Sequence, residues 1–184
     1  MAFNIYTFLS HVEKRPAMYF GKKSVSLLRA YLEGFLSALR AYDLPTESEP
    51  PFYGFHDWVA LRLGYYESTL GWSNMLLEAA DGDEAKALDN FFVLLEEYKN
   101  KQARIILQAV PDATKVWRFN VEGDKHIPVP LPALVQIVKY TDDKGVFVRY
   151  VDENGELIDR EEYSQDLEVA FFRTSSIIEK DAWK

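Results

Sequence analysis

The hydrophobic pattern of this 184-residue chain changes its period near Pro111, and this change constrains the fold more than any other feature. Before Pro111, apolar residues recur every three or four positions, as expected when one side of a helix is buried. After Pro111, short runs rich in β-branched residues alternate with turn sequences, a pattern typical of strands. Helices followed by strands predict an α+β fold.

About five helices are predicted in the first hundred residues. Asn4, Ser24 and Asp83 each precede an apolar stripe of helical period and have side chains suited to cap a helix start. Pro16 should end the first helix, and Gly21 should turn the chain. The helices are expected over residues 5–12, 24–42, 52–63, 72–80 and 83–100.

An antiparallel meander of three to four strands is predicted in the second half. Asp142–Gly145 reads as its first turn, and Asn154-Gly155, a pair favoured in tight hairpins, as its second. The main strands are expected over residues 134–140, 146–151 and 157–160, after a short strand at 116–119. Three prolines exclude residues 128–132 from a central strand. Residues 103–110 fit a strand or a helix, and a short helix at 166–173 should cover the sheet.

The chain is expected to form one domain, in which a helical part (1–102) and a sheet-rich part (103–184) share one core. It contains no cysteine, which excludes disulfides, thiolate metal sites and cysteine nucleophiles. No apolar run approaches the 18 residues that indicate a membrane span, and the first residues do not resemble a secretion signal. We therefore expect a cytoplasmic protein.

Charge is unevenly distributed along the chain. Residues 1–42 carry six Lys/Arg against two Asp/Glu, residues 43–100 carry three against twelve, and residues 101–184 carry twelve against fifteen, within a net charge of −8. A basic start beside an acidic middle favours electrostatic docking onto a protein partner. The overall acidity disfavours nucleic acid as the partner, since phosphate binding needs a basic surface.

Motifs that carry common chemistry are missing. Neither Gly-x-Gly nor Gly-x-x-x-x-Gly-Lys-Ser/Thr occurs, which argues against a dinucleotide fingerprint and a phosphate-binding loop, and there is no Gly-x-Ser-x-Gly. His11, His56 and His126 lie far apart and form no zinc motif. We therefore predict no catalytic residue, cofactor or metal. The alternative is an enzyme with a dispersed site that gathers His56 or His126 with carboxylates or Arg15.

Residues 12–21, Val-Glu-Lys-Arg-Pro-Ala-Met-Tyr-Phe-Gly, resemble a segment near the start of DNA gyrase B-type ATPases. The resemblance covers ten residues. The Asp-x-Gly-x-Gly sequence and the glycine-rich lid that hold ATP in that family are missing here, so the resemblance brings no ATP site with it.

A wider pattern is similar to small bacterial cytoplasmic proteins of polymorphic-toxin loci, some of which are candidate immunity proteins. The matching features are the Arg-Pro-x-Met-Tyr-x-Gly turn, the long aromatic helix, Phe55–Val59, Gly71–Met75, Phe91-Phe92 in an acidic helix, and the C-terminal hairpins. The resemblance implies a cytoplasmic protein that binds and neutralises a toxin domain, and it implies no catalytic residue.

Two acidic sets and one aromatic set are candidate partner contacts. The first acidic set is Asp81, Asp83, Glu84, Glu96 and Glu97, the second is Asp142, Asp143, Asp152 and Glu153, and the aromatic set is Tyr65, Tyr66 and Trp72. The acids can instead be ordinary solvated residues of turns and helix ends, and the aromatics can be core residues.

The sequence thus favours a non-catalytic protein-binding module, in particular an immunity protein that occludes a basic toxin domain. Besides the dispersed enzyme, the other alternative is a scaffold or regulatory domain that self-associates, which a large exposed apolar patch would favour. The sequence leaves the oligomeric state open.

Overall fold

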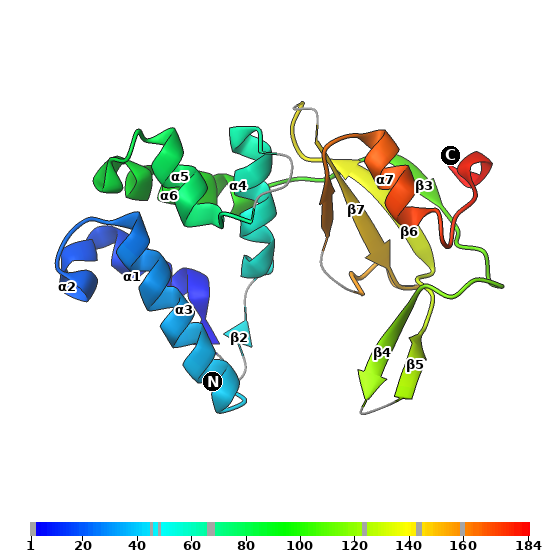
Figure 1. Ribbon diagram of the computed structural model, residues 1–184, viewed down its shortest axis with the longest axis horizontal. Coiled ribbons are helices and arrows are strands. Elements are labelled where there is room, and N and C mark those ends of the chain that lie inside the picture. The colour runs from blue at the N-terminus through cyan, green and yellow to red at the C-terminus, as the bar shows by residue number, and fades with distance from the viewer. Residues whose placement is uncertain are drawn as a thin grey trace. The chain divides into compact units, whose positions relative to one another are not determined.

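The computed structural model describes residues 3–44, 46–47, 49–65, 69–122, 125–142, 145–158 and 161–184. The fold is α+β as predicted: helices lie mostly in the first half of the chain and an antiparallel four-stranded sheet lies in the second (Figure 1). The chain divides into two compact units, Met1–Lys101 and Gln102–Lys184, called here the helical unit and the sheet unit. That the two units share one core stays a prediction.

The predicted helices are present in the helical unit, with two refinements. Its helices are α1 (Ile5–Lys14), α2 (Pro16–Phe20), α3 (Val25–Ala41), η1 (Phe52–Gly54), α4 (Phe55–Leu63), α5 (Trp72–Ala79) and α6 (Glu84–Lys99), and β1 (Phe3–Asn4) pairs in parallel with β2 (Thr46–Glu47). The helix expected over 52–63 starts with a 3-10 turn. Pro16 follows the end of α1 and also starts α2, because proline at a first helical position forfeits no hydrogen bond.

The three predicted caps are confirmed. The Asn4 side chain accepts hydrogen bonds from the backbone N–H groups of residues 6 and 7. Ser24 Oγ accepts one from Leu27 N at 3.2 Å. Asp83 accepts from Ala85 N at 2.9 Å and from the next N–H at 3.0 Å. Each cap satisfies donors that the first turn of a helix leaves unpaired, which fixes where α1, α3 and α6 begin.

The core of the helical unit combines aliphatic and aromatic side chains from five helices. Leu9, Leu28, Phe55, Met75 and Phe91 are fully buried and come from α1, α3, α4, α5 and α6. The rings of Phe55 and Phe91 meet edge to face, with centroids 5.1 Å apart. Trp58 is also buried, with its ring centroid 6.1 Å from that of Tyr98. Burial of these large side chains fixes how α6 packs in this unit.

The sheet unit contains a four-stranded sheet with the strand order β3-β6-β7-β8, in which every neighbouring pair is antiparallel. Its strands are β3 (Arg104–Ala109), β6 (Leu134–Lys139), β7 (Val146–Val151) and β8 (Glu162–Ser164), while β4 (Arg118–Glu122) and β5 (Lys125–Val129) form a separate two-stranded ribbon. Residues 103–110 are therefore largely strand. Pro128 lies in β5, which pairs with β4 alone within the described residues.

The third strand of the meander is confirmed only in part where it is predicted. Of the expected strand 157–160, Leu157 bridges Val151 and Ile158 N donates a hydrogen bond of 2.9 Å to the Tyr150 carbonyl, while residues 159–160 lie outside the described part of the chain. Regular pairing resumes in β8, where Tyr163 is opposite Phe147. Their rings lie 5.4 Å apart and both are buried, so burial of Tyr163 sets the register.

α7 (Leu167–Thr174), which Asp166 caps, lies over one face of the sheet, where a short helix is predicted (Figure 1). Ala170 of α7 and Ile177 just beyond it are buried in one core with Val135, Ile137 and Val148 of the sheet. Partly buried Trp117 and Trp183 pack at the margin of this core, the latter beyond η2 (Lys180–Ala182). Among the described residues, no helix has both the length and the apolar character needed to cross a bilayer.

Candidate functional site

A groove of about 410 Å³ lies on the helical unit, between the region where α1 gives way to α2 and one side of α6. We call it the acidic groove. Its apolar lining is Pro16, Leu88, Phe92 and Val93, and its charged lining is Glu13, Lys23, Asp89 and Glu96. Segments more than sixty residues apart in sequence therefore form one surface feature.

The apolar lining is partly open to solvent. Pro16 and Leu88 are buried and close the groove on the protein side. Phe92 is half-buried and meets Phe91 edge to face at 5.0 Å, which anchors its ring on the core. Val93 is 59% exposed. An apolar surface that is supported from below and open above can bury a partner's apolar side chain without rearrangement.

Carboxylates dominate the charged lining. Lys23 Nζ lies 3.0 Å from Asp89 Oδ1, but both side chains are more than half exposed. Glu96 accepts hydrogen bonds of 2.7 Å from Lys99 and from Asn100, which lower the pKa of its carboxyl and keep it ionised. Glu13 makes no hydrogen bond or ion pair with any side chain that the structure describes. Three carboxylates against one ammonium group give the groove a negative character.

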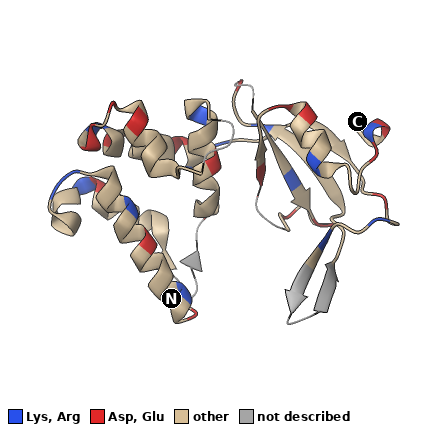
Figure 2. Cartoon of the chain, in the orientation of Figure 1, with Lys and Arg blue, Asp and Glu red and all other residues tan. Residues whose placement is uncertain are grey.

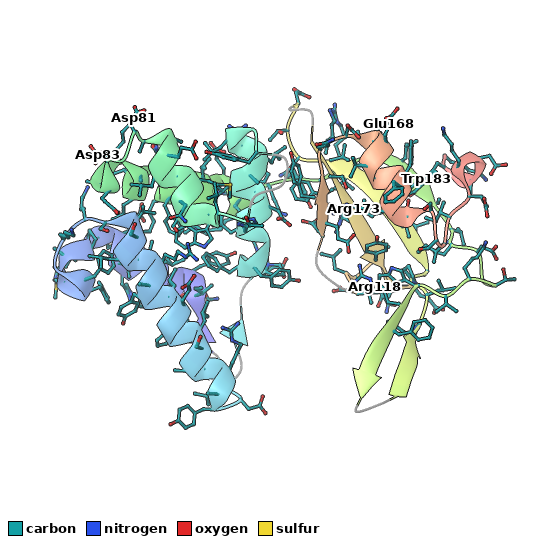
Figure 3. All side chains as sticks on the ribbon, in the orientation of Figure 1. Asp81, Asp83, Arg118, Glu168, Arg173 and Trp183 are labelled. Carbon is teal, nitrogen blue, oxygen red and sulfur yellow. The ribbon has the colours of Figure 1, made fainter. Side chains whose placement is uncertain are left out.

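Of the first predicted acidic set, Glu96 alone lines the acidic groove. Asp81 and Asp83 lie at the turn between α5 and α6 (Figure 3). Several acidic residues occur around this turn (Figure 2). Asp83 is used as the cap of α6, and Glu97 pairs with Arg62 at 3.0 Å. The structure therefore spreads this set over separate places on the helical unit.

The carboxylate of Glu84, from the same set, is used for hydrogen bonds within the protein. Its carboxylate accepts hydrogen bonds from Ser24 Oγ at 2.8 Å, Ser26 N at 3.1 Å and Ser26 Oγ at 2.7 Å. Partial burial would raise the pKa of this carboxyl, but these hydrogen bonds outweigh burial and lower it. The charge lies at the N-terminal ends of both α3 and α6, where a negative charge is favourable.

The second acidic set lies in turns of the sheet unit. Asp142 is almost fully exposed and pairs with Arg104 at 3.3 Å. Asp152 accepts hydrogen bonds from the backbone N–H groups of Glu156 and Asn154, which lower the pKa of its carboxyl and shape the turn. Glu153 is exposed at the same turn, and Asp143 is outside the described residues. Asp152 thus has a local structural role.

The aromatic set divides between core and surface. Trp72 is half-buried, and its ring lies 4.9 Å from Phe91, so it packs on the core. The Tyr65 hydroxyl donates a hydrogen bond to Glu78, which raises the pKa of Tyr65, and both residues line a shallow groove of about 300 Å³. Tyr66 lies outside the described residues.

Sequence reasoning missed two features of the helical unit. The first is the groove lining of α6, although its acidic and apolar residues follow one another on one helix face. The second is a cluster of partly exposed rings on β1, α1, α2 and α3, called here the aromatic face: Phe3, Phe8, Tyr19, Tyr31 and Phe35. The rings of Phe8, Tyr31 and Phe35 are nearly parallel, with centroids 5.6 to 6.5 Å apart.

The histidines considered for a dispersed active site are placed in different units. His56 lies on α4 and His126 on β5. The described residues that line the acidic groove and the Tyr65 groove include no histidine or arginine. Within the described part of the chain, no group of three His, Cys, Asp or Glu is placed to hold a metal ion. No protein-family model, curated protein or solved structure matches the chain.

Proposed function

We propose that this protein is a non-catalytic protein-binding module, an immunity protein that acts in the cytoplasm by occluding a basic toxin domain at the acidic groove. The observation that supports the proposal best is the apolar lining of Leu88, Phe92 and Val93 between carboxylates on both sides of the groove. The groove combines apolar contact with negative charge, a combination that suits a basic protein partner.

The two parts of the groove would contribute differently to binding. Exposed carboxylates speed encounter with a basic partner and exclude acidic ones. Burial of an apolar partner residue against Phe92 and Val93 supplies affinity, since a few desolvated contacts dominate most interfaces. The net charge of −8 also attracts a basic partner at long range. A complex of this kind should form faster at low salt.

The test is association with the product of the neighbouring reading frame, if that product is modular and ends in a basic domain. The double variant Glu13→Lys/Glu96→Lys should lower the association rate constant about tenfold at 50 mM NaCl, by biolayer interferometry, and weaken protection against the toxin domain. The matched control Glu168→Lys/Asp181→Lys makes the same charge change on the sheet unit. It should have a smaller effect that disappears by 300 mM NaCl.

The proposal fails if the basic domain neither binds the protein nor is inhibited by it. The groove as the site fails if the two double variants behave alike. Glu13 and Glu96 are exposed and lie outside the core, so their replacement should leave the helical unit folded. Circular dichroism of each variant checks this.

The aromatic face favours a second candidate function, self-association. None of its five rings is buried, and Met18 next to Tyr19 is 73% exposed. A contiguous exposed apolar patch on a protein surface is commonly an interaction site. If the protein self-associates, size-exclusion chromatography with light scattering should show a dimer, and Tyr31→Glu should convert it to a monomer. A dimer held by aromatic contacts should resist salt, whereas a complex at the acidic groove should weaken.

A further inference from the structure

We infer that the acidic groove binds an amphipathic helix of the partner, one with basic residues seven positions apart and apolar residues midway between them. This inference rests on the proposed function, because it specifies which partner segment the groove accepts. It follows from the order of side chains along α6 and from the opposite wall of the groove.

Along α6, the groove lining is acidic at both ends and apolar in the middle. Asp89 and Glu96 are seven residues apart, so they lie on the same side of the helix about 10.5 Å apart along its axis. Val93 and Phe92 lie between them. A complementary ligand must therefore present a cation, then apolar side chains, then a second cation over the same distance.

A helix satisfies this requirement with its own repeat. Residues i, i+3, i+4 and i+7 of a helix share one side and span the same 10.5 Å or so, which places Lys or Arg at i and i+7 and apolar residues at i+3 and i+4. An extended strand covers that distance in about three residues and directs successive side chains to opposite sides. A strand could therefore place either the cations or the apolar contacts on α6, but not the full set.

The opposite wall of the groove supports the same occupant. Pro16 and Glu13 lie across from α6 and extend the alternation of apolar and acidic surface. The volume of about 410 Å³ lies in the usual range of ligand pockets, so it accommodates the anchoring side chains of a helix whose backbone lies above them. Two lysines are unfavourable for this ligand. The ammonium of Lys23 lies 3.0 Å from Asp89 and that of Lys99 lies 2.7 Å from Glu96, so each would compete with one cation of the ligand.

The test uses a fluorescein-labelled, alanine-rich peptide of about 18 residues, long enough to populate a helix. The matched peptide carries Lys at i and i+7 and Leu at i+3 and i+4. A control peptide of the same composition has the two Lys adjacent and the two Leu on the opposite side of the helix. Binding to the full-length protein is measured by fluorescence anisotropy at 50 mM NaCl, and circular dichroism confirms equal helicity of the two peptides.

We expect the matched peptide to bind at least tenfold more tightly than the control. Glu96→Lys should weaken the matched complex about tenfold, because it replaces an attraction with a repulsion. Val93→Ser should weaken it about threefold through lost apolar contact. Lys23→Ala should strengthen binding of the matched peptide about twofold. The control Asp181→Lys makes the same charge change as Glu96→Lys but lies in the sheet unit, and it should alter the affinity less than twofold.

Equal binding of the two peptides overturns the inference, and so does equal weakening by Glu96→Lys and Asp181→Lys. Weaker binding of the matched peptide to the Lys23→Ala variant would also contradict the inference. The proposed function is tested separately by the toxin domain. If the groove variants slow that association while the peptides bind equally, the function stands and the helical ligand is wrong. If the peptides differ as expected and the basic domain does not bind, the groove accepts helices and the immunity function is wrong.

Discussion

The hydroxyl of Tyr98 lies 2.6 Å from the position that a Cβ atom would take at Gly54. That hydroxyl donates a hydrogen bond of 2.6 Å to the carbonyl of Pro51, so α6 holds the chain just before α4. Because Tyr98 is buried, its ring has little room to move aside.

We predict that Gly54→Ala lowers the free energy of unfolding by about 2 kcal/mol, as expected when a methyl group is forced into a packed site. Tyr98→Phe removes the hydroxyl and should cost about 1 kcal/mol through the lost hydrogen bond. The double variant should cost less than the sum of the two single changes, since phenylalanine leaves room for the methyl group. Urea denaturation measures all three, and strict additivity would show that the clash is absent.

Glu84 should make stability depend on pH in the acidic range. The pKa of its carboxyl is lowered in the folded protein, so its contribution is present above the pKa of the unfolded chain and disappears as pH falls through the folded pKa. Glu84→Gln should cost about 1–2 kcal/mol at pH 7, because two serines lose a charged acceptor, and less at about pH 3. Urea midpoints at the two pH values test this. An equal cost at both would mean that the charge of Glu84 is unimportant.

Arg118 should be sensitive even to replacement by lysine. Its guanidinium lies 4.4 Å from the ring centroid of Trp117 and 5.2 Å from that of Tyr150, and it pairs with Glu162. Figure 3 shows Arg118 at the base of the β4–β5 ribbon. Lysine keeps the charge but loses the planar stacking, so Arg118→Lys should cost about 1 kcal/mol in urea denaturation. Exposed Arg173→Lys on α7 is the control and should cost less than about 0.5 kcal/mol.

Trp72 should matter for stability and leave partner binding unchanged. Because its ring packs on Phe91 and Phe55, Trp72→Ala should lower the free energy of unfolding by about 2–3 kcal/mol, whereas Trp72→Phe should cost about 1 kcal/mol. Affinity for the partner, measured well below the melting temperature, should stay within a factor of two. A large loss of affinity without a loss of stability would restore Trp72 to the binding surface.

The features that sequence predicts best here are local ones. Asn4, Ser24 and Asp83 cap helices as expected because a cap involves residues two or three positions away. The strand after Asn154-Gly155 is predicted only in part: Leu157 and Ile158 pair with β7, but a turn signal does not determine where the regular strand begins. Burial of Tyr163 against Phe147, a contact between strands, determines that instead.

The candidate site was harder to predict for the same reason. Glu96 was singled out for its charge, but the acidic groove exists only because α6 packs beside the chain around Pro16. Sequence reveals the acidic and apolar order on α6 and does not reveal which element lies opposite. Glu84 was also chosen for its charge, but its carboxylate accepts hydrogen bonds from two serines that lie sixty and fifty-eight residues away in sequence.

The four tryptophans are divided evenly between the two units, Trp58 and Trp72 in one and Trp117 and Trp183 in the other. Each unit therefore has its own fluorescent reporters. Replacing one pair with phenylalanine leaves emission from the other unit alone, so the melting of each half can be followed in the intact chain. Coincident transitions would mean that the halves melt as one cooperative body, and separate transitions would give each half its own stability.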